Sequence, residues 1–162
     1  MLPFMIALLA LVGLRGPDRP AEAAPRQDPE PVAAPSPLLV RVDLPDVAPS
    51  GMGIPFRVVL ANGGDSAIHV ELSGRPIAFD LVVRRAERDV VWRRLEGVPV
   101  EAIFVIRTLA PGEVLSFEDR WDQRDRGGRQ VAPGSYQVRA VLPVADVPGG
   151  WGSEPRALTI IP

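Results

Sequence analysis

From residue 38 to the end of the chain, short runs of alternating apolar and polar residues are separated by Gly, Pro, Asn or Asp. Alternation with a period of two is typical of strands in sheets that bury one face and leave the other in water. No window holds a helical apolar stripe longer than two turns. Repeated short strands without helices predict an all-β domain in which two sheets pack face to face. The nine predicted strands are 38–44, 56–61, 68–73, 77–84, 89–95, 102–108, 114–121, 136–142 and 157–161.

The N-terminal part of the chain has a different composition. Residues 2–14 are an unbroken apolar stretch of 13 residues, which as a helix would span ~20 Å, short of the ~30 Å hydrocarbon core of a bilayer. With Ala21-Glu22-Ala23 as a cleavage site, residues 1–23 are predicted to be a signal peptide or N-terminal hydrophobic leader. The alternative is an uncleaved leader that acts as a weak membrane anchor, since no Lys or Arg precedes the apolar stretch. Either reading predicts an exported protein, periplasmic or extracellular.

The segment between the leader and the first strand is rich in proline. Residues 15–37 contain seven prolines together with Ala, Glu and Asp. This composition cannot bury a core and favours an extended chain. We therefore predict a Pro/Ala-rich disordered linker over residues 24–37 and one folded domain over residues 38–162.

Charge and cysteine content exclude several classes of function. The chain has 18 basic residues, all of them arginine, against 20 acidic residues, and the two kinds are interleaved. No basic stripe suited to a phosphate backbone results, so no nucleic-acid binding is expected. The chain has no cysteine, which removes disulfides, thiolate metal sites and cysteine nucleophiles.

The residues that could carry catalysis do not form a recognisable constellation. His69 is the single histidine; it alternates with Ile68 and Val70, so it is expected to face solvent. Without a second His or a Cys, no His-based zinc site is available within one chain. A Ser-His-Asp triad would have to use His69, and no G-x-S-x-G elbow accompanies any serine. Acidic residues cluster at 118–125 near Trp121, but arginines lie among them, so ion pairing is expected in place of a calcium site. We predict no catalytic, cofactor-binding or metal site, and a protein that is not an enzyme.

An ordered series of motifs resembles one family, the BsuPI-type intracellular proteinase inhibitors, over roughly residues 54–143. The motifs are Asn62, SGRPIAFDLVV at 73–83, VVWRR at 90–94, LAPGEVLSFEDRWDQ at 109–123 and GGRQVAPGSYQVRAVL at 127–142. The resemblance implies an Ig-like antiparallel β-sandwich of about 7–9 strands and inhibition of a protease. The chain departs from the family pattern after Trp92, at Leu95 and at residues 100–103.

Some of these motifs also have a direct physical interpretation. Asn62-Gly63-Gly64 can turn the chain with positive φ, and Pro111-Gly112 fits a turn before the run at 114–121. Pro133-Gly134 precedes Tyr136, a position similar to a tyrosine corner, in which the hydroxyl bonds to a nearby loop backbone. Trp92, which follows two valines, is expected in the core, whereas Trp151 lies in a glycine-rich turn.

Three functional hypotheses follow. The first is an inhibitor of a subtilisin-class serine protease that binds through loops or an edge strand; the second is a non-inhibitory envelope or extracellular module for protein or polysaccharide. The third is a hydrolase that uses the carboxylates near Trp121. The candidate loops are 96–99, 124–130 and 146–152, with Trp151, Glu96, Val100 and Arg126 as partner-binding residues. A monomer without cofactor is expected, in contact with membrane only through an uncleaved leader.

Overall fold

The computed structural model describes residues 29–35, 37–86, 89–144 and 147–162, so the predicted leader at 1–23 lies outside the described residues. Every regular element in these ranges is a strand. All nine predicted strands are present, with ends that differ by a few residues, and three short strands are added. The strands are β1 (Val32–Ala33), β2 (Leu38–Asp43), β3 (Val47–Pro49), β4 (Ile54–Asn62), β5 (Ile68–Ser73), β6 (Asp80–Ala86), β7 (Asp89–Arg93), β8 (Phe104–Leu109), β9 (Val114–Trp121), β10 (Gly134–Val144), β11 (Val147–Gly152) and β12 (Arg156–Ile161).

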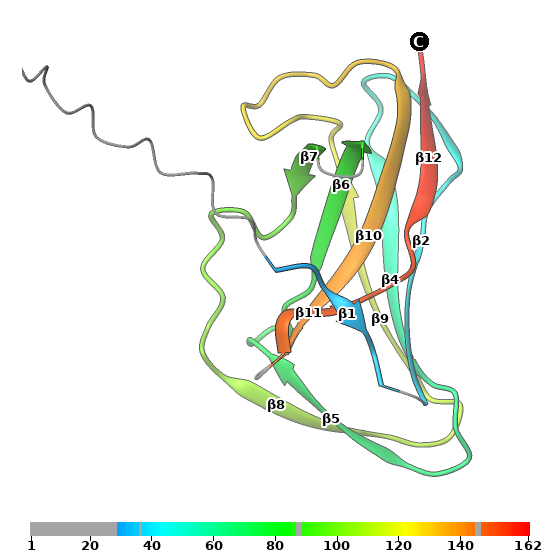
Figure 1. Cartoon of the computed structure of the whole chain (residues 1–162), viewed down its shortest axis with the longest axis vertical. Coiled ribbons are helices and arrows are strands. Elements are labelled where there is room, and N and C mark those ends of the chain that lie inside the picture. The colour runs from blue at the N-terminus through cyan, green and yellow to red at the C-terminus, as the bar shows by residue number, and fades with distance from the viewer. Residues whose placement is uncertain (1–28, 36, 87–88, 145–146) are drawn as a thin grey trace, which may run out of the picture.

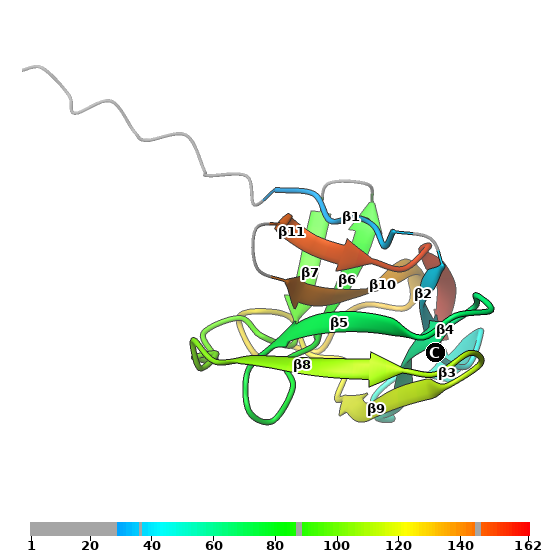
Figure 2. The same ribbon diagram turned by 90° about the horizontal axis from the view of Figure 1, so that it is seen from below.

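The strands form two layers that face each other (Figures 1 and 2). One layer is a seven-stranded sheet in which the long strand β10 pairs with β6, β11 and β12. The other layer holds the sheet β2-β4-β9 and the two-stranded sheet β5-β8. This arrangement confirms the predicted Ig-like β-sandwich. Its pairings are antiparallel except β1 with β11 and β3 with β12, which are parallel.

The core lies between the layers and follows the predicted alternation. In β4, Phe56, Val58 and Leu60 are buried, and in β10 the same holds for Tyr136 and Val138. Each set lies on one side of its strand because successive side chains point to opposite faces. The alternation therefore fixes which face of each strand enters the sandwich.

Aromatic side chains fill the centre of this core. Trp121 is 1% exposed and stacks on Trp92 with ring centroids 5.8 Å apart, while the Tyr136 ring meets it edge-on at 6.2 Å. Trp92 is partly buried against the core, as expected. The Tyr136 hydroxyl donates a hydrogen bond to the Ala132 carbonyl, so the predicted tyrosine corner is confirmed.

The turn at Asn62 is made differently from the prediction. Gly63 and Gly64 do not have positive φ, in contrast to Gly112, whose φ of 73° confirms the turn predicted at Pro111-Gly112. Instead the Asn62 amide donates to the Ser66 and Leu109 carbonyls at 2.8 and 3.0 Å and accepts from the Gly64 N–H at 2.9 Å. Gly64 is required for a close approach: a Cβ there would lie 2.7 Å from Pro37. A buried side chain therefore replaces the expected backbone conformation.

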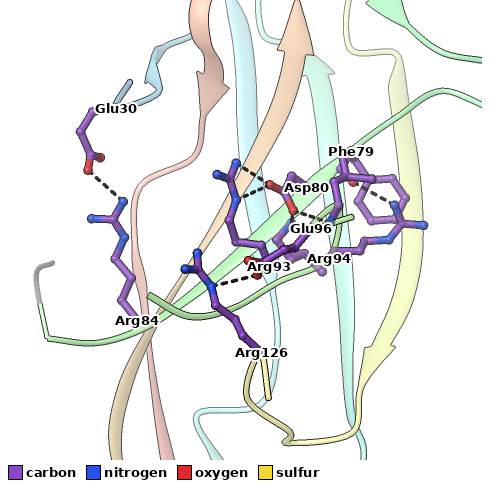
Figure 3. Close-up of polar contacts among 10 residues, drawn as sticks. Glu30, Phe79, Asp80, Arg84, Arg93, Arg94, Glu96 and Arg126 are labelled. Atoms are coloured by element: carbon purple, nitrogen blue, oxygen red, sulfur yellow. Dashed lines mark hydrogen bonds and ion pairs between the residues drawn. The ribbon is translucent and has the colours of Figure 1, made fainter. Parts of the chain in front are cut away.

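The predicted linker contributes to the sheet. Residues 32–33, which we expected in a disordered segment, form β1 and pair with Trp151 and Gly152 of β11. The Glu30 carboxylate also lies 2.8 Å from the Arg84 guanidinium (Figure 3). The composition of this segment did not predict the strand because its backbone pairs with an edge formed more than 100 residues later in the chain.

Candidate functional site

One long connection joins the two layers at the side of the sandwich. It comprises residues 94–103, called here the β7–β8 loop, and runs along the outside of the molecule from the end of β7 to the start of β8 (Figure 1). Its first residues form a turn in which the Val98 N–H donates to the Leu95 carbonyl at 3.1 Å. Gly97 has a φ of 70° in this turn, a value that glycine adopts without strain.

The first end of the loop is held by the buried carboxylate of Asp80, which is 1% exposed. One oxygen accepts the backbone N–H groups of Leu81 and Leu95 at 2.9 and 3.0 Å. The other accepts the Arg93 guanidinium at 2.9 and 2.8 Å (Figure 3). A buried charge with four charge-assisted hydrogen bonds is well compensated. Asp80 therefore ties the start of the loop to both β6 and β7.

Arg94, at the start of the loop, ties the same end to the other layer. Its guanidinium carbon lies 3.9 Å from the centre of the Phe79 ring, and the group donates to the Phe79 carbonyl at 3.0 Å. It also forms an ion pair with Asp119 of β9. Phe79 in turn stacks on Phe117 of β9, with centroids 5.3 Å apart. The arginine thus links the loop to the sheet opposite β6.

A third contact joins the loop to a second loop. The Glu96 carboxylate lies 2.8 Å from the Arg126 guanidinium, and the Arg126 backbone N–H donates to the Val91 carbonyl at 3.0 Å. Figure 3 shows this pair beside the Asp80–Arg93 pair. Together with Leu95, these four residues line a shallow depression of about 260 Å³.

The second loop, residues 124–130, is itself tightly bonded. The Asp125 carboxylate accepts the N–H groups of Gly127 and Arg129 at 2.8 and 2.9 Å and pairs with the Arg129 guanidinium. The backbone N–H of Arg129, together with that of Gly127 and the Arg129 guanidinium, lowers the pKa of Asp125 below its usual value of 3.8. This loop therefore offers Arg126 from a rigid turn.

The far end of the β7–β8 loop is held by one bond, in which the Ile103 carbonyl accepts the Gly74 N–H at 2.7 Å. Between the two ends, none of the backbone groups of residues 99–102 pairs with another backbone group of the described chain. Val98 and Val100 are 51% and 39% exposed, and Ile103 is also exposed. The loop is thus anchored at both ends while its middle presents apolar side chains to solvent.

The apolar surface continues into β8. Phe104 and Ile106 are 53% and 70% exposed and lie on the same side of the strand. Within the described chain, β8 pairs with β5 alone, so one edge of β8 has no strand beside it. Residues 98–106 thus expose five apolar side chains. Such a concentration of exposed apolar side chains is typical of a surface that binds a partner.

The structure brings two of the four predicted partner-binding residues into contact. Glu96 and Arg126 form an ion pair, and Val100 is exposed on the same loop as Glu96. Trp151, expected in a flexible turn, lies instead in β11, paired with β1 and β10 and packed against the core. The glycines before it allow positive φ inside a strand, so a glycine-rich sequence was misread as a loop.

Sequence reasoning missed the residue that organises this site. Asp80 alternates with the apolar residues Phe79 and Leu81, a pattern that predicts a solvent-facing side chain. The sequence did contain a signal: Asp80 is a lone carboxylate in an apolar run, and Arg93 and Arg94 follow in the next predicted strand. A buried acid needs such partners, and Arg93 supplies the charge.

The acidic residues near Trp121 form ion pairs, as expected. Glu118 pairs with Arg57 at 3.4 Å, Asp122 with Arg124 at 3.5 Å, and Asp119 with Arg94. Within the described ranges, no group of three metal-ligating side chains comes together. His69 is exposed, as predicted, with its Nδ1 2.9 Å from the Thr108 hydroxyl.

Comparisons with known proteins give one family and several distant structures. A family model described as "BsuPI: Intracellular proteinase inhibitor" matches residues 44–147. No curated protein sequence matches the chain.

Three solved structures illustrate the distant similarity. The CARDB domain of the PF1109 protein from Pyrococcus furiosus is 14% identical with a TM-score of 0.41, covering 76% of this chain and 87% of that one. A β-glucosidase from Listeria innocua is 14% identical with a TM-score of 0.41, covering 77% and 16%. The alkylpurine DNA glycosylase AlkC from Pseudomonas fluorescens is 14% identical with a TM-score of 0.44, covering 77% and 30%. The chain thus spans less than a third of the last two.

The family match corrects the expected location. We predicted an exported protein, periplasmic or extracellular, but the matching family is described as intracellular. The prediction was wrong because it rested on a short apolar stretch without the basic residues that precede an export signal. The part of the chain that the structure describes contains no helix capable of crossing a membrane.

Proposed function

The chain belongs to the BsuPI family of intracellular proteinase inhibitors, and from this membership we propose that it inhibits a subtilisin-class serine protease by placing the β7–β8 loop in the substrate cleft. The family supports an inhibitor function and favours a role without catalysis of its own. The class of protease and the use of this loop are the parts that we add.

One observation carries the assignment of the loop. Its two ends are fixed by hydrogen bonds: the Leu95 N–H donates to the Asp80 carboxylate, and the Gly74 N–H donates to the Ile103 carbonyl. The Val98 and Val100 side chains between these ends are exposed. A segment held in place before binding loses less conformational entropy when a partner captures it. Rigid ends and an accessible middle are what an inhibitory loop needs, because the cleft of a protease accepts an extended chain.

A second binding mode uses the open edge of β8. That strand pairs only with β5 among the described strands and exposes Phe104 and Ile106. An extended segment of the protease could add to this edge through backbone hydrogen bonds. The loop and the edge are continuous in sequence, so both can contribute to one interface.

The test is an inhibition assay with purified protein and a panel of subtilisin-class proteases whose active sites have been titrated. We expect loss of protease activity at micromolar inhibitor. The double variant Val98→Ser/Val100→Ser should weaken inhibition at least tenfold if the loop enters the cleft, whereas Ile106→Ser should do so if the β8 edge is used.

The matched control is Val47→Ser. Val47 is 53% exposed, similar to Val98 at 51%, but it lies in β3, at the end of the sandwich away from the loop (Figure 2). This control should inhibit like the wild type. Full protease activity at micromolar wild-type protein would refute the proposed function, and unchanged inhibition by both surface variants would refute the proposed site.

A further inference from the structure

We infer that the target protease has a shallow primary pocket for a small branched aliphatic side chain, and that Val100 is the residue that fills it. This inference rests on the proposed function and adds the specificity of the partner. In serine proteases the primary pocket selects the residue before the scissile bond: an acidic pocket takes basic side chains, a deep apolar slot aromatic ones, and a small pocket aliphatic ones.

The backbone of the loop restricts which residue can occupy such a pocket. The residue must have an exposed side chain and a carbonyl that is free to meet the catalytic serine. Ile103 fails because its carbonyl already accepts the Gly74 N–H. Val98 fails because the next residue is Pro99, whose nitrogen has no hydrogen and whose ring restricts the chain on that side. Val100 meets both conditions: its side chain is 39% exposed, and its carbonyl accepts no backbone N–H of the described chain.

The sequence around Val100 also favours an extended conformation. A residue that precedes proline is biased toward extended backbone, which applies to Val98. Pro99 then fixes its own φ near −65°. The two residues that precede Val100 are therefore restricted to an extended backbone, the conformation of a substrate chain in a protease cleft. Val100 lies at the end of this restricted segment.

The basic candidates nearby are ion-paired, and the aromatic one lies in a strand outside the loop. The guanidinium of Arg93 is bonded to Asp80, that of Arg94 to Asp119 and that of Arg126 to Glu96. Phe104, the aromatic residue adjoining the loop, lies in β8 with its backbone paired to Ser73. A pocket built for a basic or aromatic side chain would stay unfilled when this loop binds, so the loop suits a small aliphatic pocket.

The experiment measures inhibition constants of wild type and three Val100 variants against three serine proteases. One protease is selective for small aliphatic residues, one for aromatic residues and one for basic residues. Wild type should inhibit the first at least tenfold more tightly than the other two. Val100→Ala should weaken inhibition of the first by roughly 10- to 200-fold, the range for lost methyl groups in an apolar pocket. Val100→Arg should no longer inhibit the first protease and should inhibit the basic-selective protease more tightly than wild type does.

Controls separate this inference from the proposed function. Val47→Arg places the same charge on β3 and should leave all three inhibition constants unchanged. Circular dichroism checks folding, and Val100→Thr, which keeps the side-chain shape, serves if the arginine variant does not fold; it should weaken inhibition of the first protease severalfold.

If the wild type inhibits no protease, the proposed function itself fails. If it inhibits but Val100→Arg and Val100→Thr leave the three constants in the same ratio, only the assignment of Val100 is overturned. Tighter wild-type inhibition of the aromatic- or basic-selective protease would likewise overturn the aliphatic pocket.

Discussion

The substitution Asp80→Asn tests how the base of the β7–β8 loop is held. The asparagine keeps the shape of the side chain, and its oxygen can still accept the Leu81 and Leu95 N–H groups. Its NH₂ group, however, then faces the Arg93 guanidinium, which donates to the aspartate at 2.9 and 2.8 Å. The NH₂ group of the asparagine cannot accept from the two Arg93 N–H groups, so both hydrogen bonds to the arginine are lost.

The expected cost follows from the charge and the burial. A hydrogen bond with a charged partner contributes roughly 1.5–3 kcal/mol. The Asp80 side chain is 2% exposed, but that of Arg93 is 28% exposed, so water recovers part of the loss on the arginine side. We expect Asp80→Asn to lower the free energy of unfolding by about 2–4 kcal/mol, near the range for breaking a buried ion pair.

Urea denaturation of wild type, Asp80→Asn and Asp80→Ala measures this cost. The alanine variant also removes the acceptor for the Leu95 N–H. The Leu95 amide should therefore lose its protection from hydrogen exchange in Asp80→Ala and keep most of that protection in Asp80→Asn. Asp46→Asn is the control, because it breaks an ion pair with Arg156 in which the aspartate is 79% exposed. That control should cost less than about 1 kcal/mol. An Asp80→Asn cost no larger than the control would show that the buried carboxylate does not hold the loop.

Three further predictions concern the rest of the sandwich. Gly150→Ala should lower the free energy of unfolding by roughly 3 kcal/mol or more, because a Cβ there would lie 2.3 Å from the Leu142 carbonyl oxygen. The control Gly128→Ala, at a similar positive φ but in open space, should cost about 1 kcal/mol. Equal costs in thermal unfolding would contradict the clash at Gly150. Gln123→Ala should cost about 2–3 kcal/mol in urea, since the fully buried amide donates to the Pro49 and Met52 carbonyls, and a loss below 0.5 kcal/mol would show that water replaces the bonds. Burial raises the pKa of Tyr136 above its usual 10.0, so this tyrosine ionises first in the unfolded chain. Its contribution to stability is constant below pH 10 and falls as the pH rises further. Tyr136→Phe should remove this alkaline loss, and an unchanged pH profile would refute its origin in the tyrosine.

The strands were predictable because their signal is local. Alternation in the run around Phe56–Leu60 and in the run from Tyr136 reflects the pleat of a single strand and needs no knowledge of its partner. The turn glycine Gly112 and the tyrosine corner were predictable for the same reason, since each depends on neighbours within a few residues. Trp151 was misplaced because a glycine-rich sequence forms a strand here only through its partners β1 and β10.

The sequence by itself determined the class of fold and the absence of disulfides, because periodicity, composition and turn residues act over short distances. Only the tertiary structure decided that Glu96 meets Arg126, that Asp80 is buried beneath the loop and that the segment at 32–33 joins a sheet edge. These contacts connect residues that are 13 to more than 100 positions apart in the chain. Their energy depends on burial and on charge pairing in space, which no pattern along one strand can express.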